Sequence, residues 1–281
     1  MISSEEKKVG QEIESLLRTD RLPHVWCPGC GIGIALGSLL RAMVRVGLDF
    51  DKTVMVSGIG CTGRAAGYVY LDSFHTTHGR AIPFAVGLKL ARPDLNVIVF
   101  SGDGDLFAIG GNHILHAARR NHDMLVVCVN NYNYGMTGGQ HGPTTPSGAF
   151  TSTTPYGNPE RPMNLPHLMI SLNAPFVARW TVAHPRRLMR SFEKALQRKG
   201  FRFIEVISIC PTEFGRKNKM RDPLQYLMSI KENSVVKHDA SFEEMEIRPN
   251  KPIVVGDFRD VKVEESYEDV YYKIIRRFED A

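Results

Sequence analysis

The stretch NVIVFSGDGDLFAIGGN, residues 96–112, decides the fold. Its first half is an apolar, β-branched run, which is typical of a strand buried on both faces of a sheet. Gly102-Asp103-Gly104 ends that run, and a helical pattern over 112–120 follows it. A strand, a glycine-rich turn and a helix in this order predict one repeating unit of an α/β fold with a parallel sheet.

The same alternation extends over most of the chain. Four more apolar runs predict strands: TVMVSG (53–58), MLVVCVNN (124–131), FVARWTV (176–182) and FRFIEVISIC (201–210). Helical patterns lie between or before them, at 32–47, 82–91 and 185–200. Because continuously apolar strands need cover on both sides, the predicted fold class is α/β, a mostly parallel sheet with helices on both faces.

Two segments do not follow this alternation. Residues 132–164 are rich in Gly, Pro, Thr and Asn and lack periodicity, and so long a loop is usually functional or disordered. Residues 216–281 are polar and charged and predict a C-terminal extension, or an arm that contacts a partner, with a closing helix near 264–280. We therefore divide the chain into a main domain at 1–215 and this extension.

Composition excludes several classes of protein. The chain has 281 residues and a net charge of only +5, with its basic residues scattered, so a nucleic-acid surface is not expected. No apolar stretch reaches the roughly eighteen residues of a membrane span, which predicts a cytoplasmic protein without a membrane segment. Five cysteines, an odd number, argue against a disulfide framework and favour metal or redox chemistry.

The chemically distinctive residues follow predicted strands. Cys61 comes after 53–58, Asp103 after the strand at 96–101, Asn131 closes 124–131 and Cys210 closes 201–210. In a parallel sheet the carboxyl ends of the strands share one edge, and ligands bind there. We therefore expect these side chains to meet at one site.

Asp103 and Asn131 predict a magnesium-diphosphate site. A carboxylate and an amide oxygen suit Mg²⁺, which keeps its remaining positions for water and phosphate oxygens. Gly102 and Gly104 would let a diphosphate approach the backbone, and a helix beginning near Gly110 would offer unpaired N–H groups. The motif is neither G-x-G-x-x-G nor a G-K-[ST] loop, so an NAD-dependent dehydrogenase is a weak alternative.

GDG followed by the later NN pair resembles the thiamine diphosphate motif, which implies that Asp103, Asn131 and the main chain of Asn133 bind the metal. Several motifs in order are similar to the β subunit of the 2-oxoacid:ferredoxin oxidoreductases, in particular the 2-oxoglutarate type. The resemblance covers roughly residues 20–215. It rests on CPGCGIG, SGIGCTGR, HTTHGRAIPFAVGLKLARP, GDGDLFAIGGNH and NNYNYGMTGGQ.

Four cysteines are candidate metal ligands. Cys27 and Cys30 form a C-x-x-C pair, and Cys61 and Cys210 are expected at the strand-end edge, whereas Cys128 lies among valines and reads as a buried apolar residue. Four thiolates suit either Zn²⁺ or an iron–sulfur cluster, and residue type alone does not separate the two. The family resemblance implies one [4Fe-4S] cluster on these four positions.

The resemblance also implies an activity and partners. With thiamine diphosphate, Mg²⁺ and the cluster, the family carries out coenzyme A-dependent, reversible oxidative decarboxylation of a 2-oxoacid, here 2-oxoglutarate to succinyl-CoA and CO₂, and reduces ferredoxin. The chain has no room for a pyrimidine-binding domain. An α subunit is therefore expected to supply that domain and the activating glutamate, in an α₂β₂ assembly, and the isolated chain is expected to be inactive.

Further residues are assigned by position. Arg64 is expected to bind the distal carboxylate of the substrate, because an arginine fork matches a carboxylate. His75 and His78 are expected to transfer protons or to bind the diphosphate. The candidate cofactor-binding residues also include Gly60, Gly135, Met136 and Thr137.

Three alternatives stay open at this point. The first is specificity for pyruvate or for many 2-oxoacids. The second is a non-oxidative thiamine diphosphate-dependent decarboxylase subunit with structural cysteines. The third is a noncatalytic, zinc-stabilised binding subunit.

Overall fold

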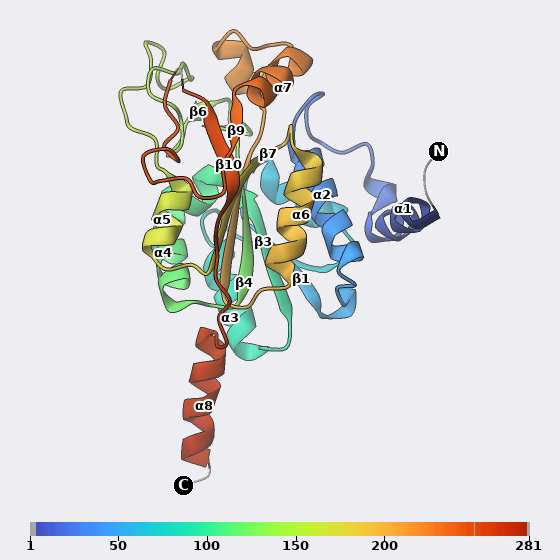
Figure 1. Ribbon diagram of the computed structural model, residues 1–281. Helices are drawn as coiled ribbons and strands as arrows, with labels where there is room; N and C mark the ends of the chain where they lie inside the picture. Colours follow the sequence, from blue (N-terminus) through green and yellow to red (C-terminus); the bar gives the residue numbers. More distant parts are fainter. Residues whose placement is uncertain (1–3, 250, 280–281) are drawn as a thin grey trace.

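The protein, described here by a computed structural model that covers residues 4–249 and 251–279, is built on one large sheet (Figure 1). Its eight strands lie in the order β2-β1-β3-β4-β8-β7-β10-β9. Their bounds are β1 Thr53–Ser57, β2 Asp72–His75, β3 Asn96–Gly102, β4 Met124–Asn130, β7 Phe176–Thr181, β8 Phe201–Ile207, β9 Ser234–Val236 and β10 Ile253–Asp260. A separate two-stranded hairpin pairs β5 Asn133–Tyr134 with β6 Gln140–His141.

Six adjacent strands, β2 to β7 in sheet order, are all parallel. The chain runs from β1 outward to β2 and then returns to the other side of β1 to form β3. The strand order therefore reverses between β1 and β3. In α/β sheets this switch point opens a crevice at the carboxyl ends of the strands, where ligands bind.

Helices cover both faces of the sheet, which confirms the predicted fold class. On one face pack α1 Ser4–Leu16, α2 Ile32–Arg45 and α6 Pro185–Leu196; on the other pack α3 Ala81–Ala91, α4 Gly111–Arg120 and α5 Leu165–Ser171 (Figure 1). The alternation within β4 shows why: Val127 and Val129 enter the first core, while Val126 and Cys128 enter the second. Cys128 is fully buried, as its apolar neighbours predicted.

The C-terminal extension is partly built into the sheet. β10 pairs with β7 in antiparallel register, and β9 pairs with β10. α7 Pro223–Glu232 lies at the carboxyl-end side, and α8 Tyr267–Glu279 projects away from the opposite end of the body (Figure 1). The segments on either side of residue 215 contribute strands to the same sheet. The division of the chain at this residue stays a prediction.

Two local features differ from the sequence-based prediction. The helix after β3 was expected to begin near Gly110. Instead, a π-helical segment, η4 Gly104–Ile109, begins directly after Asp103 and leads into α4. The strand β2 was not predicted; its side chains are exposed, so the sequence carries no apolar run there. Within the described residues, no helix is both long enough and apolar enough to cross a membrane.

Candidate cofactor site and cysteine cluster

A cavity of about 160 Å³ lies at the switch point of the sheet. It is lined by residues 59–62 after β1, by 102–105 after β3, by 131 and 133–137 after β4, and by His78. The predicted cofactor residues therefore share one cavity: Gly60, Gly102, Asp103, Gly104, Asn131, Asn133, Gly135, Met136 and Thr137. The topology accounts for this, because three strand ends meet there.

Asp103 is the buried carboxylate of the cavity. Its side chain is 2% exposed, and burial raises its pKa to about 6, although a hydrogen bond from Thr144 opposes that shift. Nearby, Asn131 and Asn133 are also buried, and the Asn133 Oδ1 atom is buried without a hydrogen-bond partner in the structure. A buried carboxylate and an unpartnered amide oxygen form an all-oxygen donor set, which fits a hard divalent cation.

The second aspartate of GDGD holds the cavity wall in place. Asp105 accepts hydrogen bonds from the backbone N–H groups of Ile59 (3.1 Å) and Gly79 (2.7 Å) and from the Ser101 hydroxyl (2.8 Å). His78 Nδ1 lies 2.7 Å from the same carboxylate. A carboxylate favours the imidazole tautomer that carries the Nδ1 proton, which leaves Nε2 for a ligand.

Gly58 has to be glycine because of this arrangement. A Cβ atom at Gly58 would lie 1.9 Å from Asp105 Oδ2. Asp105 was not among the residues predicted for the site. The one feature of the sequence that could have indicated Asp105 is the second acid in GDGD, two residues after Asp103.

A series of hydrogen-bonded, buried polar groups extends from Asp103 across β4, β8 and β7 to the C-terminal extension. Thr144 Oγ1 lies 2.6 Å from Asp103 Oδ2 and 2.8 Å from Asn130 Oδ1. The Asn130 amide donates to Glu205 (2.7 Å), and Arg179 Nε donates to the other oxygen of Glu205 (2.6 Å). Arg179 also donates to the carbonyl of Met245 in the C-terminal extension (2.6 Å).

Glu205 and Arg179 are both at most 1% exposed and lie opposite one another on β8 and β7. This pair was not predicted. The sequence feature that could have indicated it is a charged residue in the middle of each of two apolar runs, FVARWTV and FRFIEVISIC. A buried pair of this kind needs both partners, since one charge left alone in the core is strongly destabilising.

The four predicted metal-binding cysteines lie near one another. Burial raises the pKa of Cys30 to about 12, and nearby negative charge on Cys210, Cys61 and Cys27 adds to that rise. Burial likewise raises the pKa of Cys61 to about 11, with smaller contributions from Cys210 and Cys27. In the described part of the chain, no three His, Cys, Asp or Glu side chains form a group that could hold a single metal ion.

Local structure supports the cysteines. The Ile32 N–H, at the start of α2, donates to Cys30 and lowers its pKa against the effect of burial. The indole of Trp26 donates to the carbonyl of Cys61 at 2.7 Å. A Cβ atom at Gly135 would lie 3.5 Å from Cys210 Sγ, 3.8 Å from Asn133 Oδ1 and 3.9 Å from Asn131 Nδ2. The cysteine cluster therefore adjoins the wall of the cofactor cavity.

Two of the three predicted catalytic residues do not line this cavity. Arg64 and His75 lie in a separate hollow, which is lined in part by the 3₁₀ segment η3 Thr62–Tyr68 and also contains Arg18 and Arg21. His75 Nδ1 shares a 3.0 Å hydrogen bond with the Ser57 hydroxyl at the end of β1. Only His78 joins the cofactor residues.

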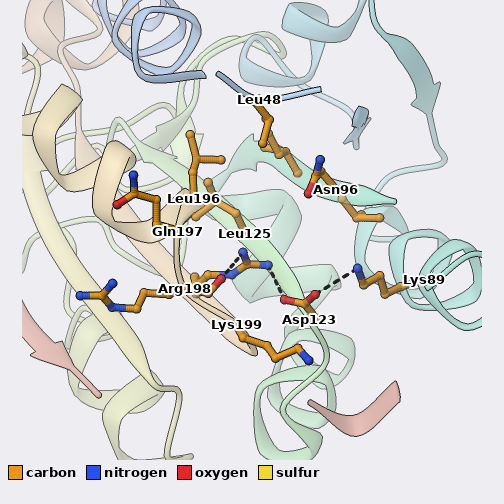
Figure 2. Close-up of a pocket in the computed structure, with 12 residues that line it drawn as sticks. Leu48, Lys89, Asn96, Asp123, Leu125, Leu196, Gln197, Arg198 and Lys199 are labelled. Carbon is orange, nitrogen blue, oxygen red and sulfur yellow. Dashed lines mark hydrogen bonds and ion pairs between the residues drawn. The ribbon is translucent and has the colours of Figure 1, made fainter. Parts of the chain in front are cut away.

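Another hollow, shown in Figure 2, lies at the amino ends of β3, β4 and β8, away from the cofactor cavity. Its positive charges are already matched: Lys89 and Arg202 both pair with Asp123, at 3.0 and 2.8 Å. Arg198 and Lys199 pair with Asp260 and Asp269 of the C-terminal extension. This hollow joins the sheet to the extension and shows no ligand chemistry.

Comparisons with known proteins agree with the geometry. The family described as "Thiamine pyrophosphate enzyme, C-terminal TPP binding domain" matches residues 58–206, which begin directly after β1 and include β3 and β4. Fold, site and family match together define a thiamine diphosphate-binding enzyme domain.

Relatives narrow the family further. The 2-oxoglutarate synthase subunit KorB of Methanothermobacter marburgensis is 52% identical over 255 residues, which cover 91% of this chain and 89% of that protein. KorB of Methanocaldococcus jannaschii is 50% identical over 264 residues, or 93% and 96% of the two chains. The chain belongs to the β subunits of the 2-oxoacid:ferredoxin oxidoreductases, which confirms the resemblance drawn from the motifs.

A solved structure supports the same family. The 2-oxoglutarate:ferredoxin oxidoreductase from Magnetococcus marinus, with 2-oxoglutarate, coenzyme A and succinyl-CoA bound, matches with a TM-score of 0.84 and 32% identity. The match covers 95% of this chain and 90% of that one.

Proposed function

We propose that this chain is the catalytic subunit of a 2-oxoglutarate:ferredoxin oxidoreductase. In this proposal it converts 2-oxoglutarate and coenzyme A to succinyl-CoA and CO₂, reversibly, and passes the two electrons to ferredoxin. The names of the relatives and the ligands of the Magnetococcus marinus structure support this substrate. Pyruvate and broader 2-oxoacid specificity are the alternatives.

One observation carries the proposal: Gly135 brings Cys210 Sγ and the amides of Asn131 and Asn133 together at a single wall. Asp103, Asn131 and the main chain of Asn133 would hold Mg²⁺ and, through it, the diphosphate. Thiamine diphosphate, when bound, supplies the electron sink that loss of CO₂ from a 2-oxoacid requires. A redox centre on the adjoining cysteines would then lie next to the site where electrons are released.

Cys27, Cys30, Cys61 and Cys210 would hold a [4Fe-4S] cluster, which accepts and releases electrons one at a time. Two observations support this donor set: the other three cysteines lie near enough to Cys30 to add to the rise of its pKa, and the Ile32 N–H donates to Cys30. Hydrogen bonds to cluster sulfurs adjust the reduction potential. The raised pKa values of Cys30 and Cys61 mean that cluster binding releases protons.

The remaining site residues bind and orient. His78, fixed by Asp105, would present Nε2 to the cofactor or substrate inside the cavity. Residues 133–137 line the cavity and would limit access of water. Arg64, which lines the neighbouring hollow, stays our candidate for the distal carboxylate of the substrate.

The proposal includes a partner. An α subunit would supply the pyrimidine-binding domain and the activating glutamate, in an α₂β₂ assembly. Two apolar residues of the cavity lining, Ile59 and Met136, are exposed, which supports a second domain over the site.

The test is anaerobic co-purification with the α subunit, followed by measurement of 2-oxoglutarate-dependent reduction of ferredoxin. We expect reduction to require coenzyme A, to be absent with this chain alone, and to be lost in Asp103→Ala. Release of CO₂ without reduction of ferredoxin would contradict the proposal and favour the non-oxidative decarboxylase.

A further inference from the structure

A second hollow, of about 290 Å³, lies beside the cofactor cavity. Its charged lining consists of three arginines, Arg18, Arg21 and Arg64, and it also contains His75. No carboxylate is among its lining residues, and within the described parts of the chain none of the three arginines forms an ion pair. This contrasts with the hollow of Figure 2, where every cation is paired.

Two of the arginines are held in position by groups other than carboxylates. Arg18 Nε donates to the carbonyl of Val69 at 3.0 Å, and its guanidinium lies 4.8 Å from the centre of the Tyr70 ring. Arg21 Nη1 donates to the carbonyl of Gly67 at 3.1 Å. These contacts orient both forks and leave other N–H groups for a ligand. A pre-oriented fork loses little entropy when it binds an oxyanion.

The hollow and the cofactor cavity share one segment as a wall. Cys61 and Thr62 line the cavity, while Gly63 and Arg64, next in the chain, line the hollow. A ligand with a charged end in the hollow and a flexible arm would therefore enter the cavity around η3.

We propose that this hollow binds a phosphate group of coenzyme A, with Arg18 and Arg21 as the principal ligands. The inference rests on the proposed function for the identity of the phosphate donor. Arg18 and Arg21 carry two positive charges, which one carboxylate does not neutralise, whereas a phosphomonoester with a charge of about −2 does. Arginine forks bind phosphate oxygens bidentately.

A carboxylate of the 2-oxoacid is the other oxyanion that the same chemistry would bind. The two ligands predict different effects of the arginines: on binding of the 2-oxoacid if the hollow holds a carboxylate, and on binding of coenzyme A if it holds a phosphate. Arg64, on the shared wall, is the arginine nearest in sequence to the cavity and is reserved for that role. Arg18 and Arg21 come from a different part of the chain and are not needed for it.

The experiment uses the co-purified holoenzyme with the variants Arg21→Gln and Arg18→Lys, the second of which keeps the charge but loses the fork. Binding of coenzyme A and of dephospho-coenzyme A is measured by calorimetry, and the KM values for coenzyme A and 2-oxoglutarate are measured by turnover. Arg41→Gln is the matched control, because Arg41 also donates to a backbone carbonyl (Gly37, 2.9 Å) but lies outside the hollow. Thermal unfolding confirms that each variant is folded.

We expect each variant to weaken coenzyme A binding about tenfold or more, to raise the KM for coenzyme A similarly, and to leave the KM for 2-oxoglutarate unchanged. Loss of the difference between coenzyme A and dephospho-coenzyme A in the variants would identify the 3′-phosphate as the bound group. A raised KM for 2-oxoglutarate instead, or unchanged binding of both coenzymes, would overturn the inference. Because binding is measured without turnover, failure of the proposed oxidoreductase activity would be distinguishable from failure of this site.

Discussion

Thr144 is the residue that connects the buried carboxylate of the cofactor cavity to the rest of the protein. Its single hydroxyl proton lies between two acceptors, Asp103 Oδ2 and Asn130 Oδ1. When Asp103 is ionised, as a metal ligand must be, this proton stabilises the carboxylate. The neighbouring Glu205 acts in the opposite direction, because its negative charge helps to raise the pKa of Asp103.

We expect Thr144→Val to weaken binding of Mg²⁺ and thiamine diphosphate about tenfold, because a buried carboxylate loses a hydrogen bond worth about 1–3 kcal/mol. Equilibrium binding of Mg²⁺ to the anaerobic holoenzyme checks this. Thr144→Ser is the control and should bind nearly as tightly as the unaltered protein. If the valine and serine variants lose equal affinity, packing of the methyl group, and not the hydroxyl, holds Asp103.

A second prediction at this scale concerns Arg64. If its fork binds the distal carboxylate of the substrate, Arg64→Ala should lower kcat/KM for 2-oxoglutarate by about tenfold or more and leave that for pyruvate much less affected, since pyruvate lacks this carboxylate. Steady-state kinetics on both substrates provide the measurement. Equal losses on the two would contradict a role in specificity.

At the scale of secondary-structure elements, the sequence predicted the strands that carry the site because each is a continuous apolar run that ends in a polar motif. β1, β3, β4 and β8 were all predicted on this basis, and their shared edge followed from parallel pairing. β2 and the π-helical segment η4 were not predicted. The side chains of β2 are exposed, and η4 depends on tertiary contacts of Asp105 that no local pattern reveals.

The site shows the same division. The candidate metal ligands could be predicted from the motifs GDG, NN and C-x-x-C, because carboxylate and amide oxygens suit Mg²⁺ and thiolates suit zinc or an iron–sulfur cluster. The placement of Arg64 and His75 in a neighbouring hollow could not be predicted, because it depends on how η3 and the unpredicted strand β2 pack against the residues near Arg18. Thr144 lies in a loop without periodicity, so its contact with Asp103 also required the structure.

The closing helix α8 provides a prediction about pH. Glu268 is buried, and although burial favours a higher value, hydrogen bonds from His122 and from the Asp123 N–H lower its pKa below the ordinary 4.5. A lowered pKa in the folded state stabilises the protein above about pH 4.5, and this stabilisation is lost as the pH falls through the folded-state value. The first turn of α8, which carries Glu268, should therefore loosen from the body in acid.

Glu268→Gln should remove this effect near neutral pH and lower the free energy of unfolding by about 1–3 kcal/mol. Limited proteolysis of α8 together with thermal unfolding checks it. Glu265→Gln is the control, since Glu265 pairs with Lys273 on the surface and an exposed pair contributes little. Equal protease resistance of α8 in the two variants would contradict a docking role for Glu268.

At the scale of the whole molecule, the C-terminal extension and the cofactor cavity belong to one structure. β10 completes the sheet beside β7, and Arg179 ties the Met245 carbonyl of the extension to Glu205, and through Asn130 and Thr144 to Asp103. A continuous series of buried polar contacts therefore connects the extension to the cavity. Cys61 lines the same cavity, and Cys210 lies close to Gly135 of its wall.

In the function that we propose, a redox cluster on four cysteines adjoins a thiamine diphosphate site. The most direct test of this proposal is the iron, acid-labile sulfide and zinc content of the chain purified anaerobically with its α subunit. We predict about four irons and four sulfides per chain, with iron lost in Cys210→Ala but retained in Cys128→Ala. About one zinc per chain without sulfide would contradict the account and make the cysteines structural.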